Sequence, residues 1–177
     1  FNAGAVRYNG KYLLLLRTEN FARMVEFHVA TSDDGVKFDV NPDTIRYPRN
    51  PLEERFPTGH RFDMRITPLD GWYYVCHAVW ITPFGSMIGM GRTRDFVTFE
   101  PIGRCSVPWN RNAVLFPEKI GGRYVRFERP YDEGGGSGGI WVSYSPDLIH
   151  WGDAMPITLP VMPWNWRKTG ACVVPIR

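Results

Sequence analysis

The stretch Arg61-Phe-Asp-Met-Arg-Ile-Thr-Pro-Leu69, followed by Asp70-Gly71 and the aromatic run 72–80, decides the fold expected for this chain. Asp-Gly between two apolar runs is a strong hairpin signal, so two strands are expected to meet at a tight turn. Side chains two apart in a strand share a face, so Arg61, Asp63 and Arg65 are expected to point the same way. One carboxylate would then stand between two guanidinium groups. The alternative is a solvated ladder of surface salt bridges, because such charge sets are usually exposed.

The features of this hairpin recur along the chain. Hairpin glycines stand at Gly10, Gly71 and Gly122, and both their spacing and that of a set of turn aspartates step by 61 and then by about 51 residues. Those aspartates are Asp34, Asp95 and Asp147, and the aromatic residues four positions after them are Phe38, Phe99 and Trp151. Four short strands per unit at such a period predict the blades of a β-propeller. A β-sandwich with accidental similarity is the alternative.

The repeat predicts strands for each unit. The first unit has strands on both sides of Asn9-Gly10, a strand over 25–31 and a short one after the turn at 32–38. The second has strands over 62–68, 72–80, 86–92 and 96–100, and the third over 112–116, 123–129, 140–144 and 150–151. A fourth unit is expected to begin with a strand at 170–175. No helix longer than a turn or two is expected, the glycine-rich run 134–139 is predicted to be a flexible loop, and 42–57 a long connection over one face.

Composition places the chain in one all-β domain and excludes several functions. It has 177 residues, 15% of them aromatic, with 18 Gly and 15 Pro, which suits short strands and tight turns. The net charge of +3 comes without a lysine-rich run, and no apolar run approaches the ~20 residues of a membrane span. Nucleic acid and membrane partners are therefore not expected. The three cysteines and four histidines lack metal-ligand spacing, so we expect no metal and a reduced protein. No signal peptide opens the sequence, and a cytoplasmic location is expected. Residue 1 nevertheless reads as mid-domain sequence, so an upstream signal peptide could be missing. The oligomeric state stays open, and a homo-oligomer is possible.

The candidate site follows from the repeat. The first strand of each propeller blade lines the central channel, so the residues that open these strands should converge. They are Asn2, Asp63, Arg111-Asn112 and the region of Lys168, and the positions seven past each hairpin glycine add Arg17, Ala78 and Arg129. Glu128 adjoins Arg129 but is expected on the opposite face. A glycosidase that uses water normally needs two carboxylates, whereas an arginine cluster binds an anion. If the anion is phosphate it can itself attack the anomeric carbon, so this set fits phosphorolysis better than hydrolysis.

Several stretches resemble glycoside hydrolase family 130, the inverting β-mannoside phosphorylases, and the resemblance covers nearly the whole chain. They are Phe-Asn-Ala at 1–3, Leu-Leu-Leu-Leu-Arg at 13–17, Phe-Asp-Met-Arg-Ile-Thr-Pro-Leu-Asp-Gly at 62–71, Asn-Arg-Asn-Ala-Val-Leu-Phe-Pro-Glu-Lys-Ile at 110–120, Arg-Phe-Glu-Arg-Pro at 126–130 and Ser-Pro-Asp-Leu-Ile-His-Trp-Gly at 145–152. The resemblance implies a five-bladed β-propeller, of which residues 1–177 would be a partial catalytic domain of about the first three blades, with the C-terminal blades missing.

The resemblance also implies roles for individual residues. Asp63 matches the general acid, which in this family acts through the 3-hydroxyl of the sugar. Asn2, Arg17 and Arg65 resemble mannosyl-binding residues, and Arg111, Asn112, Arg129 and Lys168 resemble the phosphate site. The implied reaction uses a β-mannoside oligosaccharide and inorganic phosphate, needs no cofactor and releases α-mannose 1-phosphate. Two departures stand out. The chain stops about three blades in, so the phosphate-binding His and a further sugar-binding Asp of the family are expected in the missing part and cannot be matched. The other departure is Ala3, which stands where many relatives carry a small polar or Pro residue.

Three functions remain in competition at this point. The first is the phosphorylase, the second a β-mannosidase that uses water on the same fold, and the third a non-catalytic carbohydrate-binding propeller. The hydrolase should carry acidic residues in place of the arginine set, which this sequence keeps. The acceptor sugar and the linkage, β-1,4 or β-1,2, stay open.

Overall fold

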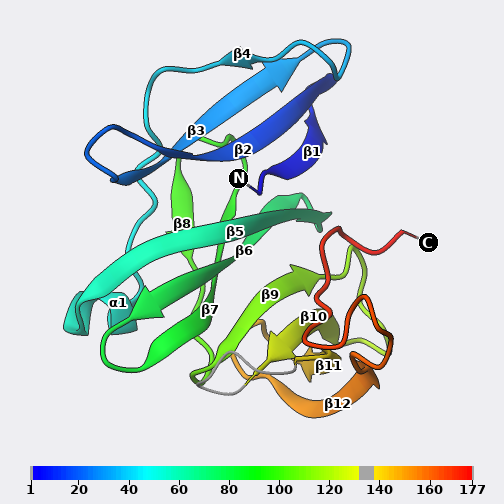
Figure 1. Cartoon of the computed structure of the whole chain (residues 1–177). Coiled ribbons are helices and arrows are strands. Elements are labelled where there is room, and N and C mark those ends of the chain that lie inside the picture. The colour runs from blue at the N-terminus through cyan, green and yellow to red at the C-terminus, as the bar shows by residue number, and fades with distance from the viewer. Residues whose placement is uncertain (1, 132–137, 177) are drawn as a thin grey trace.

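The computed structural model describes residues 2–131 and 138–176, which form three four-stranded antiparallel sheets in chain order (Figure 1). The first sheet has the order β1 (Gly4–Tyr8), β2 (Lys11–Glu19), β3 (Val25–Ser32) and β4 (Asp39–Val40). The second has β5 (Thr58–Leu69), β6 (Trp72–Ile81), β7 (Gly85–Thr93) and β8 (Phe99–Pro101). The third has β9 (Asn110–Leu115), β10 (Tyr124–Pro130), β11 (Ile140–Ser145) and β12 (Gly152–Thr158). The all-β class is therefore confirmed, with one five-residue helix, α1 (Pro51–Arg55).

Turn chemistry fixes the meander of each sheet. The first hairpin turns at Asn9-Gly10, the second at Asp70-Gly71 and the third at Gly121-Gly122, and both residues of each pair have positive φ. A two-residue turn with two positive φ values matches the right-handed twist of the flanking strands. The turn aspartates also behave alike. Each accepts hydrogen bonds from the backbone N–H groups two and three residues later, as Asp95 does from Val97 and Thr98 at 2.9 and 2.8 Å.

The sheets stack through apolar faces. Leu13, Leu15 and Phe27 of the first sheet pack with Met64 and Ile66 of the second. A separate cluster joins the second and third sheets through Tyr74, Ile88 and Met90 on one side and Ala113 and Leu115 on the other. As a result β1 contacts β5 and β5 contacts β9, so the first strands of successive sheets lie side by side (Figure 1). This adjacency is what the sequence repeat required for a shared site.

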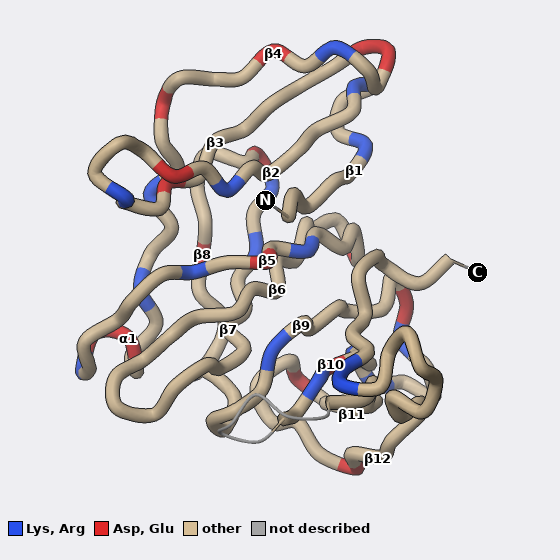
Figure 2. Tube along the Cα trace, in the orientation of Figure 1, with Lys and Arg blue, Asp and Glu red and all other residues tan. Residues whose placement is uncertain are grey.

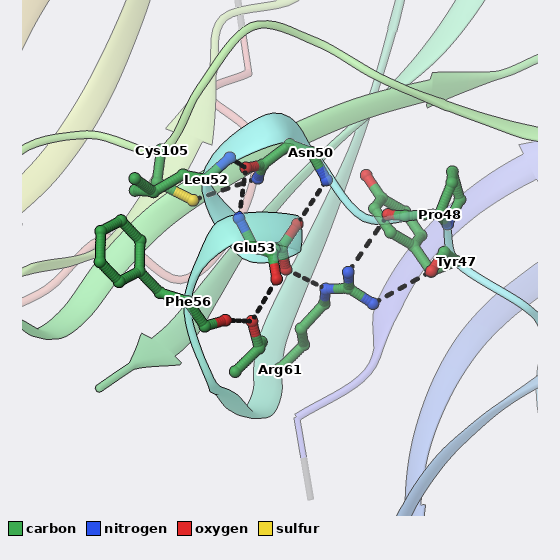
Figure 3. Close-up of polar contacts among 9 residues, drawn as sticks. Tyr47, Pro48, Asn50, Leu52, Glu53, Phe56, Arg61 and Cys105 are labelled. Carbon is green, nitrogen blue, oxygen red and sulfur yellow. Dashed lines mark hydrogen bonds and ion pairs between the residues drawn. The ribbon is translucent and has the colours of Figure 1, made fainter. Parts of the chain in front are cut away.

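The long connection 42–57 is anchored by an ion pair between Glu53 and Arg61. Asn50 caps α1, and Glu53 completes a capping box by accepting from the Asn50 N–H at 2.9 Å. Glu53 is 1% exposed, and its other oxygen accepts from Arg61 Nε at 2.7 Å (Figure 3). Arg61 also donates to the carbonyl groups of Tyr47 and Pro48, both at 3.1 Å. The connection is thereby fixed to the start of β5.

Three expectations need correction. Arg61 does not share a face with Asp63, because it turns to Glu53 and because a bulge in β5 interrupts the alternation of side chains. The last strand of the third sheet begins at Gly152, one residue after the stretch 150–151 predicted for it. Residues 170–176 form no strand, since no neighbouring strand in the described part of the chain offers them a ladder. Residues 132–137, which include most of the glycine-rich run 134–139, lie outside the described residues, and Gly138 forms a parallel bridge to Lys168. In the described part of the chain, no helix has the length and apolarity to cross a membrane.

Candidate active site

Two matching β-bulges aim the central side chains of the site. On β5 the step from Phe62 to Arg65 faces the shorter step from Ala78 to Cys76 on β6, so β5 carries one extra residue. The irregularity recurs on β9, where the step from Arg111 to Val114 faces that from Arg129 to Phe127 on β10. The extra residue brings left-handed backbone in both cases, with φ of 58° at Asp63 and 57° at Asn112. Asp and Asn tolerate this conformation better than other residues with a Cβ, and bulges commonly re-aim side chains beside active sites.

Asp63 is the buried carboxylate at the centre of the site. It is 8% exposed, and its Oδ1 accepts from the side-chain amide of Asn2 at 2.5 Å. Its Oδ2 accepts from Arg111 Nη2 at 3.1 Å. Burial on its own raises the pKa of Asp63, but the hydrogen bonds from Asn2 and Arg111 and the charges of Arg111 and Arg65 outweigh it, so the pKa is lowered. The free site therefore holds Asp63 as an anion.

Arg111 and Arg129 place two positive charges next to this carboxylate. They are register partners across β9 and β10, and Figure 2 shows the basic segments of these two strands side by side. Burial lowers the pKa of Arg129, and the charge of Arg111 lowers it further, while Tyr131 and Asp63 act in the opposite direction. A Cβ at Gly170 would lie 3.4 Å from both Arg129 Nη1 and Asn112 Cγ. The segment around Gly170 therefore passes closely over these two side chains.

Of the ten buried side-chain polar atoms that lack a partner among the described residues, five belong to predicted site residues. In the described part of the chain these atoms include Arg17 Nε, Arg65 Nε, Arg111 Nε, Asn112 Oδ1 and Arg129 Nε. Buried polar groups are normally hydrogen-bonded, and exceptions call for an explanation such as a bound molecule or water. Four guanidinium donors and an amide oxygen match the hydroxyl groups of a sugar and the oxygens of an anion.

The structure gathers most of the predicted site residues and leaves two at its margin. Hydrogen bonds, strand pairing or electrostatic interactions join five of them, namely Asn2, Asp63, Arg65, Arg111 and Arg129, and Asn112 lies beside Arg129 under the segment around Gly170. Arg17 follows Leu15, the partner of Gly4, so the same register continued by two residues sets Arg17 opposite Asn2. Lys168 is exposed, and within the described residues no hydrogen bond or ion pair joins its side chain to the group. The roles assigned to all these residues stay predictions.

Residues missed from the sequence frame the same site. The guanidinium carbon of Arg111 lies 4.9 Å from the centre of the Phe62 ring, and that of Arg129 lies 5.9 Å from the Tyr131 ring. The Cys172 sulfur lies 4.0 Å from Arg65 Nη2. Phe62 directly precedes Asp63, and Tyr131 lies two residues after Arg129. This closeness in sequence is the one signal that could have found them. Nothing in the sequence brings residue 172 to residue 65.

The tryptophans near the basic residues divide into two groups. Trp109 packs edge-on against Trp80 and Tyr131, with ring centres 5.6 and 5.9 Å apart. Trp164 and Trp166 are 77% and 64% exposed.

Among the described residues, no group of three or more His, Cys, Asp or Glu side chains is placed to hold a metal ion.

Fold and site together place the chain among the all-β carbohydrate-active proteins. The chain belongs to glycoside hydrolase family 130, whose family model, described as beta-1,4-mannooligosaccharide phosphorylase, matches residues 1–167. It is 35% identical over 184 residues to the Beta-1,4-mannooligosaccharide phosphorylase of Ruminococcus albus, covering 99% of this chain and 54% of that protein. It is 32% identical to the 4-O-beta-D-mannosyl-D-glucose phosphorylase of Bacteroides fragilis, covering 84% of this chain and 41% of that protein. The chain thus spans about half the length of the curated relatives it matches.

Solved structures agree with this assignment. The Beta-1,2-Mannobiose phosphorylase of Listeria innocua, solved in complex with beta-1,2-mannobiose, superposes with a TM-score of 0.83 at 25% identity, covering 100% of this chain and 64% of that chain. A thermostable family-43 glycoside hydrolase superposes with a TM-score of 0.67 at 14% identity, covering 92% of this chain and 54% of that one, which shows a shared fold alone.

Proposed function

We propose that the protein containing this chain is an inverting phosphorylase that cleaves β-mannosides with inorganic phosphate and releases α-mannose 1-phosphate. Family membership supports this proposal, and one observation of the site carries it. Asp63, the buried carboxylate at the centre of the site, is bridged to Arg111, whose register partner Arg129 also has a buried and unpaired Nε in the described part of the chain. This set offers one acid and an anion site, which phosphorolysis requires.

The proposed step assigns each group a part. A phosphate oxygen attacks the anomeric carbon of the mannosyl unit while the bond from that carbon to the glycosidic oxygen breaks. The departing oxygen takes a proton from the 3-hydroxyl of the sugar, and that hydroxyl takes one from Asp63, so Asp63 ends as a carboxylate. Asn2, Arg17 and Arg65 would bind the mannosyl unit. Arg111, Asn112, Arg129 and Lys168 would bind phosphate, through bidentate guanidinium contacts where these are available.

Phosphate replaces the second carboxylate that an inverting hydrolase needs to activate water. Glu128, next to Arg129 in sequence, does not supply one. It is 7% exposed and forms an ion pair with Arg126 at 2.7 Å, and Arg126 Nη1 contacts Met90 Sδ on β7. Glu128 is thus buried in an ion pair with Arg126 between the second and third sheets.

We also propose that the whole protein is a five-bladed β-propeller, of which this chain forms about three blades. Three sheets account for 64% of the length of the superposed mannobiose phosphorylase. A propeller of five blades would add about two more, which fits the range of four to eight blades known for this architecture. The three cysteines are free thiols, which supports a reducing, cytoplasmic setting for the enzyme.

Product analysis tests the reaction. The whole protein is incubated with β-1,4-mannobiose or β-1,2-mannobiose, with and without inorganic phosphate. We expect sugar phosphate to form only with phosphate, from one linkage in preference to the other. Equal cleavage in phosphate-free buffer, with mannose as product, would overturn the proposal. Binding of mannobiose without any product would indicate a non-catalytic carbohydrate-binding protein.

A further inference from the structure

We propose that Arg111 leaves its ion pair with Asp63 and binds the incoming phosphate instead. After this exchange of partners, called the handover below, Asp63 takes up its proton. This inference rests on the proposed function and concerns the order of events in the same site. It assigns Arg111 two successive partners and makes the acid dependent on the nucleophile.

The hydrogen bonds of Asp63 show why the free site is not ready to act. A general acid must carry a proton before it can give one. Both carboxylate oxygens already accept hydrogen bonds, Oδ1 from Asn2 and Oδ2 from Arg111. A proton on either oxygen would face a donor rather than an acceptor, and the positive charge beside it favours the anion. Each oxygen keeps a second lone pair, so release of the Arg111 contact is not a steric requirement but would make protonation of Asp63 more favourable.

Arg111 is the contact that an anion can remove. Asn2 offers a neutral amide, whereas Arg111 offers a full charge that a phosphate dianion attracts. The Arg111 side chain is 31% exposed, compared with 9% for that of Asp63, so it lies on the open side of the pair. Its Nε is buried and has no partner among the described residues. The same is true of the Nε of Arg129, which lies opposite it. Phosphate held between these two side chains would compete with Asp63 for the guanidinium group.

The remaining charged and titratable groups around Asp63 do not change charge with it. Arg65 on β5, Arg129 on β10 and Arg17 on β2 stay positive at all ordinary pH values. On β6, burial raises the pKa of Cys76 to about 11 and lowers that of His77 to about 3, so both are neutral between about pH 4 and 9. The Cys172 thiol touches Arg65, and Tyr131 lies beyond Arg129. Asp63 is the group of this set whose proton the anion controls directly.

This order has a chemical consequence. Without phosphate, Arg111 keeps Asp63 ionised and no acid is available to protonate a leaving group. A water molecule that reached the anomeric carbon would then meet a site without its acid. Phosphate binding would supply the nucleophile and release the acid together, which favours phosphorolysis over hydrolysis.

Calorimetry with sulfate tests the handover, because sulfate stays a dianion across this pH range while phosphate itself titrates. Sulfate is titrated into the whole protein at about pH 5.5, above the ordinary pKa of Asp, in two buffers with different heats of ionisation. The difference between the two heats gives the number of protons taken up. We expect uptake above about 0.2 proton per chain for the unchanged protein and none for Asp63→Asn. Asp63→Asn should also bind sulfate at least about threefold more tightly, because Arg111 then has no negatively charged partner to leave.

Variants of Arg111 separate a handover from a simple effect of the anion's charge. In Arg111→Met, sulfate still binds at higher concentration through Arg129 and Asn112, but Asp63 has no Arg111 to lose. We expect uptake at saturation to fall to less than about half, with Arg111→Gln as a second variant if the first is poorly folded. Glu100→Gln, which removes an exposed carboxylate paired with Arg92, is the matched control and should keep full uptake.

Two outcomes would overturn the handover: no proton uptake in the unchanged protein, or full uptake in the Arg111 variants. The product assay separates this failure from failure of the proposed function. Sugar phosphate formed without proton uptake would refute the handover and leave the phosphorylase standing. Proton uptake that depends on Arg111, in a protein that forms no sugar phosphate, would do the reverse.

Discussion

Arg111 on β9 and Arg129 on β10 stand directly opposite each other, and the carboxylate of Asp63 from the second sheet contacts Arg111 alone of the two. Like charges opposite each other in a sheet are destabilising. The lowered pKa of Arg129 agrees, since burial lowers it first and the charge of Arg111 adds to that effect. The free protein thus maintains a repulsive pair for which a bound anion would compensate.

Arg129→Met should therefore weaken phosphate binding without reducing stability. Methionine keeps an apolar stem against Gly138 and removes the charge that repels Arg111. We expect the KM for phosphate to rise at least about tenfold, while the melting temperature stays equal or rises. Arg123→Met, which removes an exposed arginine paired with Asp153, is the control and should leave the KM unchanged. A normal KM in Arg129→Met would remove this residue from the phosphate site.

Asp63→Asn should lower turnover strongly without weakening anion binding. Asparagine keeps the size of the side chain and its tolerance of left-handed backbone but cannot release a proton. Removing a general acid typically costs about 10²- to 10⁴-fold in rate, so kcat should fall by that factor. Steady-state kinetics and sulfate calorimetry measure the two properties separately. An Asp63→Asn enzyme with normal kcat would show that the acid lies elsewhere.

Substitutions at Asp63 should also reveal the strain of its bulge. Both Asp63→Gly and Asp63→Ala remove the carboxylate and its contacts, so their difference reports on the backbone alone. At a φ of 58°, alanine meets a penalty of about 1–2 kcal/mol that glycine escapes. We expect Asp63→Gly to be the more stable of the two by about that amount in urea unfolding. The same order is expected for Asn112→Gly and Asn112→Ala, and the reverse order at either position would contradict the bulge.

His77 should make the protein sensitive to acid. It is 2% exposed, and burial lowers its pKa to about 3, whereas an unfolded histidine titrates near 6.5. Between these pH values the histidine binds a proton in the unfolded chain but not in the folded chain. The free energy of unfolding is therefore at its full value above about pH 6.5 and decreases as the pH falls towards 3. The slope contributed is up to about 1.4 kcal/mol per pH unit. Urea unfolding of His77→Gln should show a flatter profile over this range, whereas His60→Gln, which changes an exposed histidine, should keep the original slope.

Glu53→Gln should destabilise the anchored connection. Glutamine retains the capping box but leaves the partly buried Arg61 without its counter-charge. Removing one partner of a buried ion pair typically costs about 3–5 kcal/mol, and we expect a loss in that range on urea unfolding. Glu54→Gln changes an exposed neighbour in the same helical turn and should cost less than about 0.5 kcal/mol. Similar stability of the two variants would mean that Arg61 contributes little.

Most of the fold could be predicted because it depends on local chemistry repeated at a fixed period. Gly10, Gly71 and Gly122 fix the hairpins by their positive φ, and the turn aspartates fix the next connections by their own backbone contacts. These signals need no partner from another part of the chain. The strand predicted at 170–175 failed for the opposite reason, since a strand exists only with a neighbour.

The proximity of the predicted site residues followed from the sequence, but their geometry did not. The repeat correctly brought Asp63, Arg111 and Arg129 to adjoining first and second strands. It could not show the bulge at Asp63, because a period-two pattern assumes that no residue is inserted. For the same reason Arg61 was wrongly placed with Asp63, although Glu53, eight residues earlier, was available to pair with it. The ion pair of Asp63 with Arg111 depends on side-chain conformations that no sequence pattern specifies.

The equivalence of Asn2, Asp63 and Asn112 carries a consequence for how such a site could arise. The registers of the three sheets put these residues at one corresponding place, two positions before Gly4, Arg65 and Val114. An ancestral unit bearing an amide there, duplicated along a gene, would already have gathered its copies around one point. The second copy carries a carboxylate, Asp63, at the place where the first and third carry the amides of Asn2 and Asn112, so one substitution in a repeated unit is enough to make the charge of that place differ from its neighbours.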